Sequence, residues 1–547
     1  MASRLTTYIV VLIVTGTVIA GLIVGAQRDD ASGPVDLIIT NGRVFTGAGG
    51  ELAEALAVQG NKILRVGSNR EIKRLRRPQT LMLDAHGGAV LPGLIDTHVH
   101  LGEAVRSAVG VDLAGATTAD AVQARLGAFA EAHPATTWIR GHGWPSDRFV
   151  GATPTKRLLD DAVSGRAALV LAEDGRTAWA NSRALMLAGI TRHTPNPKGG
   201  VIVRDIRTGE PTGELKDAAR ELVTRVLPEP TEAERLEALQ ATVQQAHSVG
   251  VTSVHSIADT DDDLELYHAL RSTGDLRLRV YSTIGISLSN WQEQARRLET
   301  LHERYPDDPV LKTGAAVVTP DEADAAGVDG VGNARDLDLA QLVSFLDAHG
   351  WQVLVETPSE AGVAAALDAF EAALDGTPPP IRGRRHRLEQ VASVAAHDVE
   401  RMARLELAAS MAVPDDESDR DACRLLADAG ARITFGSDWP SSILDPRSAL
   451  AIAGPDVRLD EEGIEPPEPP REALTLPQAI DAQTADAAWA SFDDQRKGSL
   501  QRGMMADIVI LTSDIFAPGR RLMDVEVDMT IFDGEVVYSR AADAGTH

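Results

Sequence analysis

Over most of its length the chain alternates short apolar runs with longer segments in which apolar residues recur every three or four positions. A short apolar run is typical of a buried strand, and the longer period is typical of an amphipathic helix. Strands that alternate with helices predict a parallel sheet joined by helical crossovers. Eight strands are predicted, near residues 94–100, 251–256, 276–284, 311–316, 351–356, 386–390, 406–412 and 432–438. Eight such units form a TIM-type (β/α)8 barrel, whose chemistry takes place at the carboxyl ends of the strands.

One crossover helix can be bounded from the sequence alone. Thr231 followed by Glu234 forms a capping box, in which each residue satisfies a backbone N–H at the start of the helix. Apolar spacing continues through ERLEALQATVQQAHSV, and Gly250 ends the helix before the strand VTSVHS.

Both ends of the globular part have a β-rich pattern. DLIITNGRVF, ALAVQGNKILRVGS and TLMLDAHGGAV lie before the barrel, and MADIVIL and MTIFDGEVVYS lie after it. Their alternating residues and Asn-Gly or Asp-Gly turns predict short strands. We therefore expect a small β-sandwich made from residues 35–92 and 497–547, beside a barrel over residues 93–496. Residues 101–230 are too many for a simple crossover, so we expect an insertion over the barrel mouth.

The first residues predict a membrane segment. Leu5–Ala26 contains no charged residue and is long enough to cross a hydrocarbon core of about 30 Å. Arg4 precedes it and an acidic pair follows, which favours a single-pass protein with its globular domain outside the cytoplasm. We expect residues 1–34 to be a membrane anchor and linker. The alternative is secretion after cleavage of a signal peptide near Val24–Ala26.

Composition narrows the choice of partners and metal ligands. The net charge of −27 argues against a nucleic acid partner, while an oligomer stays open. The single cysteine, Cys423, excludes an intramolecular disulfide and a cysteine-based zinc cluster. We expect Cys423 to be a buried thiol, so any metal would be held by imidazole and oxygen ligands.

Two motifs carry candidate metal ligands. In PGLIDTHVH a predicted strand ends with His98 and His100, which stand two residues apart and therefore on the same face. Both imidazoles can then reach one ion. In ITFGSDWP a second strand ends at Asp438, whose carboxylate can bind a metal and accept a proton from water. The alternative for Asp438 alone is a helix N-cap.

These two motifs and the closing KGSLQRGMMADIVIL resemble the amidohydrolase superfamily. WIRGHGW, EDGRTAWANSRAL, PTGEL, GVTSVH and RHRLEQ are similar to its amidohydrolase-3-type branch. The resemblance extends from about Asp36 to Tyr538. It implies hydrolysis of amide, ring or ester bonds by one or two metal ions, usually zinc, held in a TIM barrel. It also implies that His98, His100 and Asp438 belong to the metal site.

The resemblance assigns further residues. Lys312 falls where the branch has a strand-four lysine that bridges metals when it is carboxylated; the alternative is an ordinary lysine at a strand end. Arg176, Gln390 and Trp144 become candidate substrate-binding residues, and the guanidinium of Arg176 is suited to a carboxylate.

The chain departs from the branch at three positions. Glu356 replaces a strand-five histidine, Gln390 replaces the histidine of a strand-six Glu-His pair, and Arg176 replaces the histidine of Asp-Gly-His. A carboxylate such as that of Glu356 can still bind zinc, whereas an amide is a poor ligand. These changes argue against a two-zinc site and predict one divalent ion, Zn²⁺ or Mn²⁺.

Two functions follow from this pattern. The first is a metal-dependent hydrolase of carbon–nitrogen bonds other than peptide bonds, acting on a small-molecule substrate through metal-activated water. The alternative is a degenerate amidohydrolase fold that serves as a membrane-tethered binding or scaffold protein. Retention of His98, His100, Lys312 and Asp438 favours the first, and the three replacements favour the second.

Overall fold

The computed structural model describes residues 34–47, 52–150, 154–319, 334–374, 379, 383–412, 417–442, 444–451, 474–517 and 522–543. The apolar segment Leu5–Ala26 lies outside these ranges, so the expected membrane anchor is not part of the described structure. Within the described ranges, no helix is both long and apolar enough to span a bilayer.

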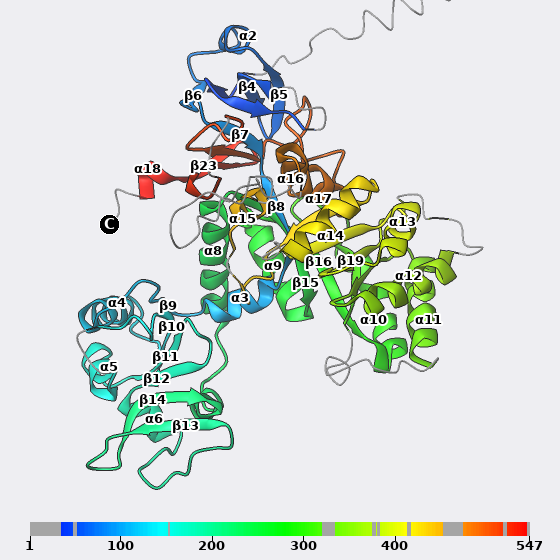
Figure 1. Cartoon of the computed structure of the whole chain (residues 1–547). Coiled ribbons are helices and arrows are strands. Elements are labelled where there is room, and N and C mark those ends of the chain that lie inside the picture. The colour runs from blue at the N-terminus through cyan, green and yellow to red at the C-terminus, as the bar shows by residue number, and fades with distance from the viewer. Residues whose placement is uncertain are drawn as a thin grey trace, which may run out of the picture.

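The centre of the molecule is a barrel of eight parallel strands in the order β21-β20-β19-β18-β17-β16-β15-β8 (Figure 1). Each of the eight predicted ranges overlaps one strand, which confirms the expected barrel. Their bounds are β8 Leu94–Val99, β15 Val251–Asp259, β16 Arg279–Ser287, β17 Leu311–Thr319, β18 Gln352–Glu356, β19 Arg387–Glu389, β20 Ala408–Ala412 and β21 Arg432–Gly436. The backbone N–H of His100 donates to Trp439 O at 2.8 Å, so β8 meets the segment after β21.

Helices cover the outside of the barrel. They are α8 Glu232–Ser248, α9 Asp261–Thr273, α10 Trp291–Arg304, α11 Ala334–Ala348, α12 Glu360–Leu374, α13 Ala396–Arg404, α14 Glu417–Asp428, α15 Arg447–Ala451, α16 Leu476–Ala482 and α17 Ala485–Ala490. The capping box of α8 is present: Thr231 N donates to Glu234 Oε2 at 2.8 Å, and Glu234 N donates to Thr231 Oγ1 at 3.2 Å. Cys423 on α14 is fully buried, as expected.

The two ends of the globular part meet in one sheet. This six-stranded sheet has the order β24-β23-β22-β7-β2-β3, and a four-stranded sheet with the order β5-β4-β1-β6 lies next to it. The bounds are β1 Leu37–Thr40, β2 Arg43–Phe45, β3 Leu52–Ala53, β4 Ala55–Gln59, β5 Lys62–Gly67, β6 Leu81–Asp84, β7 Ala89–Pro92, β22 Ile508–Leu511, β23 Val527–Phe532 and β24 Glu535–Ser539. Buried Arg279 of β16 joins this part to the barrel through ion pairs of 2.6 Å with Asp507 and Asp533.

The insertion after β8 is a separate α/β unit. After α3 (Leu101–Ser107) it forms a six-stranded sheet with the order β13-β14-β12-β11-β10-β9. Its elements are β9 Val111–Asp112, α4 Ala119–Ala132, β10 Trp138–Trp144, α5 Lys156–Ala162, β11 Ala167–Ala172, β12 Thr177–Ala180, α6 Ser182–Leu187, β13 Gly200–Arg204, β14 Pro211–Asp217 and α7 Glu221–Thr224.

The position of the insertion differs from the one expected. Figure 1 shows it beside the barrel, joined through α3 and α8, and not across the carboxyl ends of the strands. A contact with a barrel helix agrees with this placement, because His133 lies 3.7 Å from Glu237 of α8. The expectation of an insertion over the mouth is therefore wrong in this structure.

Candidate metal centre

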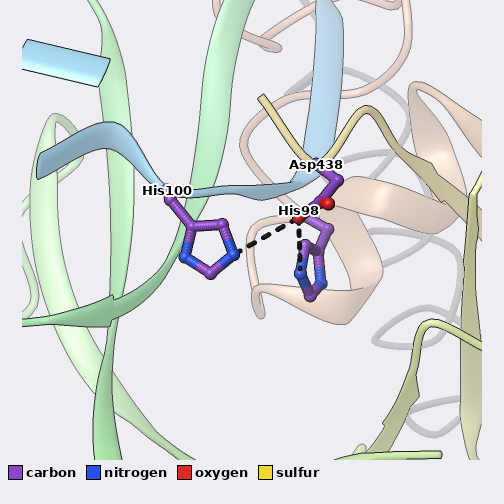
Figure 2. Close-up of side chains that lie close together, drawn as sticks. All are labelled: His98, His100 and Asp438. Atoms are coloured by element: carbon purple, nitrogen blue, oxygen red, sulfur yellow. Dashed lines mark ion pairs between the residues drawn. The ribbon is translucent and has the colours of Figure 1, made fainter. Parts of the chain in front are cut away.

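Three side chains converge at the carboxyl end of the barrel. His98 is the penultimate residue of β8, His100 precedes α3, and Asp438 follows β21. The Nε2 atom of His100 lies 3.3 Å from Asp438 Oδ1, and the Nε2 atom of His98 lies 3.7 Å from the same oxygen. Figure 2 shows both imidazoles directed at this carboxylate. One ligand atom from each residue lies within 4.8 Å of the others, which is the spacing of a candidate metal site.

Asp96 holds the two sides of this site together. Its Oδ1 atom accepts hydrogen bonds from the backbone N–H of His98 at 3.2 Å and of Ser437 at 3.0 Å. The carboxylate therefore ties β8 to the loop that carries Asp438. Burial raises the pKa of Asp96 to about 6, against the opposing effect of these hydrogen bonds.

A glutamate fixes the orientation of His98. The Nδ1 atom of His98 lies 2.8 Å from Oε2 of Glu389, and both side chains are buried. Because an ionised carboxylate only accepts, Nδ1 is the donor and Nε2 presents its lone pair to the site. Gln390 Nε2 lies 3.4 Å from His98 Nε2 and donates toward that lone pair. A carboxylate behind a ligating histidine is the usual support of a protein metal site.

Arg387 in turn supports Glu389. Its guanidinium lies 2.7 Å from Glu389 Oε1, donates to Thr97 O at 2.8 Å and donates to His255 Nδ1 at 2.7 Å. Arg387 is fully buried, so these partners compensate for the loss of water. Burial and the adjacent Arg387 keep the pKa of His255 well below its usual value, which leaves its imidazole neutral.

On the exposed side of the site, His100 and Asp438 each stabilise the charged form of the other. The hydrogen bond to Asp438 raises the pKa of His100, although burial opposes the shift. The same bond lowers the pKa of Asp438, which is therefore ionised at neutral pH. An ionised carboxylate and two imidazoles form a donor set for a borderline divalent cation.

The backbone of the GSDWP segment is adapted to this site. A Cβ atom on Gly436 would lie 2.2 Å from Cβ of His98, so the close approach of β21 to β8 requires glycine. Asp438 has a φ of 58° and Gln390 a φ of 54°, a region that non-glycine residues rarely adopt. Such conformations persist where the surrounding contacts enforce them.

Glu356 stands next to the three ligands without joining them. It ends β18, and burial raises the pKa of its carboxyl, with further increases from Glu389 and Asp438. His98 and His100 act in the opposite direction on the same pKa. Glu356 is thus close enough to interact with the site electrostatically, but it is outside the group of three.

Lys312 is not part of the site, and its expected role as a carboxylated ligand is corrected. It is the second residue of β17 and therefore lies at the amino end of the barrel. Its Nζ atom donates to Ser491 O at 2.6 Å and pairs with Asp493 at 2.8 Å. Ile95, near the start of β8, donates to Gln483 O at 2.8 Å. The chain after α16, to which Gln483 belongs, therefore meets the amino end of the barrel.

Two expected substrate-binding residues are also far from the site. Trp144 is fully buried in the core of the insertion, where its ring centroid lies 5.0 Å from that of Trp179. The side chain of Arg176 is 76% exposed and pairs with Asp217 at 2.8 Å in the same unit. Of the three residues expected to bind substrate, the structure brings only Gln390 to His98.

Sequence reasoning missed the supporting roles of Asp96, Glu389 and Gly436. The signal for Asp96 was present, because it stands two residues before His98 and therefore on the same face of the strand. Glu389 gave no local sign of its partner, since 291 residues separate it from His98.

Comparison with known proteins identifies the class to which this fold and site belong. The chain is a member of the amidohydrolase family, whose sequence profile matches residues 82–538. It is 28% identical to Protein LONG AFTER FAR-RED 3 of Arabidopsis thaliana, with 92% of this chain and 91% of that protein covered. It is 26% identical to N-substituted formamide deformylase of Arthrobacter pascens, with 92% and 98% covered.

A solved structure supports the fold. An uncharacterized metal-dependent hydrolase from Pyrococcus furiosus superimposes with a TM-score of 0.61 at 20% identity, covering 86% of this chain and 98% of that protein.

Proposed function

We propose that the protein is a metal-dependent hydrolase of carbon–nitrogen bonds other than peptide bonds in a small substrate. The observation that carries the proposal is the orientation of His98. Glu389 holds its Nδ1–H, so Nε2 faces His100 Nε2 and Asp438 Oδ1. His98, His100 and Asp438 would hold one divalent ion, Zn²⁺ or Mn²⁺.

The metal would polarise the substrate carbonyl and make water a stronger nucleophile. The remaining chemistry belongs to the side chains. Asp438 is ionised and its side chain is 35% exposed, so it can accept a proton from the attacking water. It then returns that proton to the departing nitrogen as the carbon–nitrogen bond breaks. Gln390, with its amide at the site, is placed to bind the substrate.

Family membership supports the proposed substrate class. The formamide deformylase among the relatives acts, by its name, on N-substituted formamides. A cyclic amide, an N-acyl amino acid or a similar small carbon–nitrogen compound fits the same chemistry.

Metal content of the full chain, purified without chelator, tests this proposal. We expect about one equivalent of Zn²⁺ or Mn²⁺ by elemental mass spectrometry, and its loss in His98→Ala/His100→Ala. His86→Ala/His193→Ala is the matched control, because both histidines are exposed and lie in other parts of the fold. A chain that stays without metal after reconstitution would refute the hydrolase.

One observation favours a second function, a degenerate amidohydrolase that binds small molecules without turnover. The amide of Gln390 donates toward the His98 lone pair that a metal needs. Rotation of that amide would free the lone pair, so the two functions differ in whether metal displaces Gln390. A chain that takes up no metal, binds a small amide and hydrolyses no formamide or cyclic amide would support this second function.

We also propose, from the sequence, that Leu5–Ala26 tethers the globular domain to the outer side of a membrane. Fractionation of cells that express the full chain tests this, since protease added outside should cleave a tethered domain. Release of a shortened soluble chain would instead indicate signal cleavage.

A further inference from the structure

The four-stranded sheet carries a concentration of positive charge that the proposed hydrolase does not use. Residues 60–80 contain seven lysine and arginine residues and one acid, in a chain with a net charge of −27. The seven are Lys62, Arg65, Arg70, Lys73, Arg74, Arg76 and Arg77, all of them exposed. They lie on β5, on α2 (Asn69–Lys73) and just after it, at the opposite end of the molecule from β13 (Figure 1).

In the part of the chain that the structure describes, these cations form no close ion pair with a carboxylate. Within the described residues, no ion pair joins any of the seven, or nearby exposed Arg502, to an acid. The one acid within residues 60–80, Glu71, caps α2 by accepting from Ser68 N at 3.0 Å and Ser68 Oγ at 2.8 Å. These hydrogen bonds lower its pKa, and the nearby charges of Arg65 and Arg70 lower it further. Elsewhere the arginines are commonly paired, as Arg271 is with Asp308 at 3.0 Å. A cluster of unpaired like charges costs stability unless an anion binds there.

A cavity opens beside this cluster. Its volume is about 590 Å³, within the range of roughly 300–1,000 Å³ that small-molecule sites occupy. Arg65, Arg77 and Arg502 line it together with the apolar side chains of Leu64, Leu75 and Leu500. Guanidinium groups are suited to phosphate, and the apolar walls are suited to hydrocarbon.

We propose that this cavity binds an anionic phospholipid, with the headgroup phosphate on the arginines and an acyl chain along the apolar wall. Charge complementarity selects an anion, and the leucines select one that carries a hydrocarbon chain. A nucleic acid is a poor occupant because the rest of the chain is strongly acidic and would repel a polyanion. The inference is independent of the metal centre at the opposite end of the barrel.

The place of the cavity in the chain agrees with a lipid occupant. Val35 also lines it and stands nine residues after Ala26, the last residue of the apolar segment. Nine residues of extended chain span at most about 32 Å. Basic groups near a bilayer add to its attraction for anionic lipid.

Calorimetric titration of the full chain in a nonionic detergent tests the proposal. The probes are dihexanoylphosphatidylglycerol, dihexanoylphosphatidylcholine and inorganic phosphate. We expect saturable binding of the glycerol lipid, at least tenfold weaker binding of the choline lipid, and no binding of phosphate at the same concentrations. Equal affinity for the two lipids, or equal affinity for phosphate alone, would overturn it.

A set of charge-matched variants locates the site. Arg65→Ala/Arg77→Ala/Arg502→Ala should weaken binding of the glycerol lipid on the order of a hundredfold, at about fivefold for each lost charge. Arg157→Ala/Arg183→Ala/Arg207→Ala changes the net charge equally on the exposed surface of the insertion and should bind as the wild type does. All six arginines are exposed, so both variants should fold. Unchanged binding in the first variant would refute the site.

Discussion

The Nδ1 atom of His98 lies 2.8 Å from Oε2 of Glu389, across the barrel from β8 to β19. This pair decides which nitrogen of His98 faces Asp438, and therefore whether the three side chains can act together as ligands. The carboxylate is held by Arg387, which is itself fully buried. The metal centre thus depends on charged groups inside the barrel as well as on its ligands.

Glu389→Gln should lower the affinity for Zn²⁺ about 10- to 100-fold, because a neutral amide holds the Nδ1–H of His98 less firmly. Competition with a chromophoric chelator measures this affinity. Glu232→Gln, at the exposed start of α8, is the control. An affinity equal to that of the wild type would show that Glu389 does not orient His98.

Gln390→His should strengthen metal binding at least tenfold, or raise the metal content above one ion per chain. The added imidazole would stand beside His98 Nε2, where the amide nitrogen now lies at 3.4 Å. Elemental analysis after dialysis against Zn²⁺ gives the stoichiometry. Gln495→His, on the surface, controls for adventitious binding by an extra histidine. The expectation fails if both variants bind equally.

Gly436→Ala should destabilise the fold by about 1–3 kcal/mol and weaken metal binding, since the new methyl group would overlap Cβ of His98. Denaturant unfolding and chelator competition measure the two effects. Gly362→Ala in α12 is the matched control, because its Cβ would make only ordinary contacts, at 3.5 Å or more, with Ser359 and Thr357. A stable variant with full metal affinity would contradict the close approach of β21 and β8.

Lys312→Met should keep the metal content of the wild type but lower the free energy of unfolding by about 3 kcal/mol. The loss arises because buried Asp493 loses the partner at 2.8 Å. Thermal unfolding and elemental analysis of the same sample separate the two results. Lys216→Met, which removes an exposed pair with Glu214, should change neither. Loss of metal from a folded Lys312→Met chain would show that Lys312 takes part in metal binding.

Asp259 should make the protein less stable as the pH rises. Its buried carboxylate accepts from Ser256 Oγ at 2.7 Å and Tyr267 OH at 3.0 Å, and burial raises its pKa to about 7. The folded state therefore holds a proton that the unfolded state releases near pH 3.8. This contribution is complete below pH 3.8 and is lost as the pH rises through about 7.

Asp259→Asn lacks this titration. The difference in unfolding free energy, wild type minus variant, should fall by about 1.4 kcal/mol per pH unit between these limits. Urea unfolding from pH 4.5 to pH 8 measures it, with exposed Asp275→Asn as the control. A difference that is constant with pH would show that Asp259 does not hold the proton.

Local patterns along the chain were sufficient to predict the barrel, the β-rich ends and the three candidate ligands. These features follow from local spacing: apolar runs mark strands, and residues two apart, such as His98 and His100, share a face. The predicted strand ranges also argue against Lys312 as a ligand. Lys312 is the second residue of the predicted strand 311–316, so it lies at the amino end of the barrel, opposite the metal centre.

Contacts between groups that are distant in sequence became visible only in the folded chain. The fold buried Trp144 in the insertion, paired Arg176 with Asp217, and placed the insertion beside the barrel. It also brought Glu389 to His98 and Gln390 to the same imidazole. Spacing along the chain reports how one element presents its faces, whereas contacts between elements depend on how their surfaces pack, and packing is a property of the whole fold.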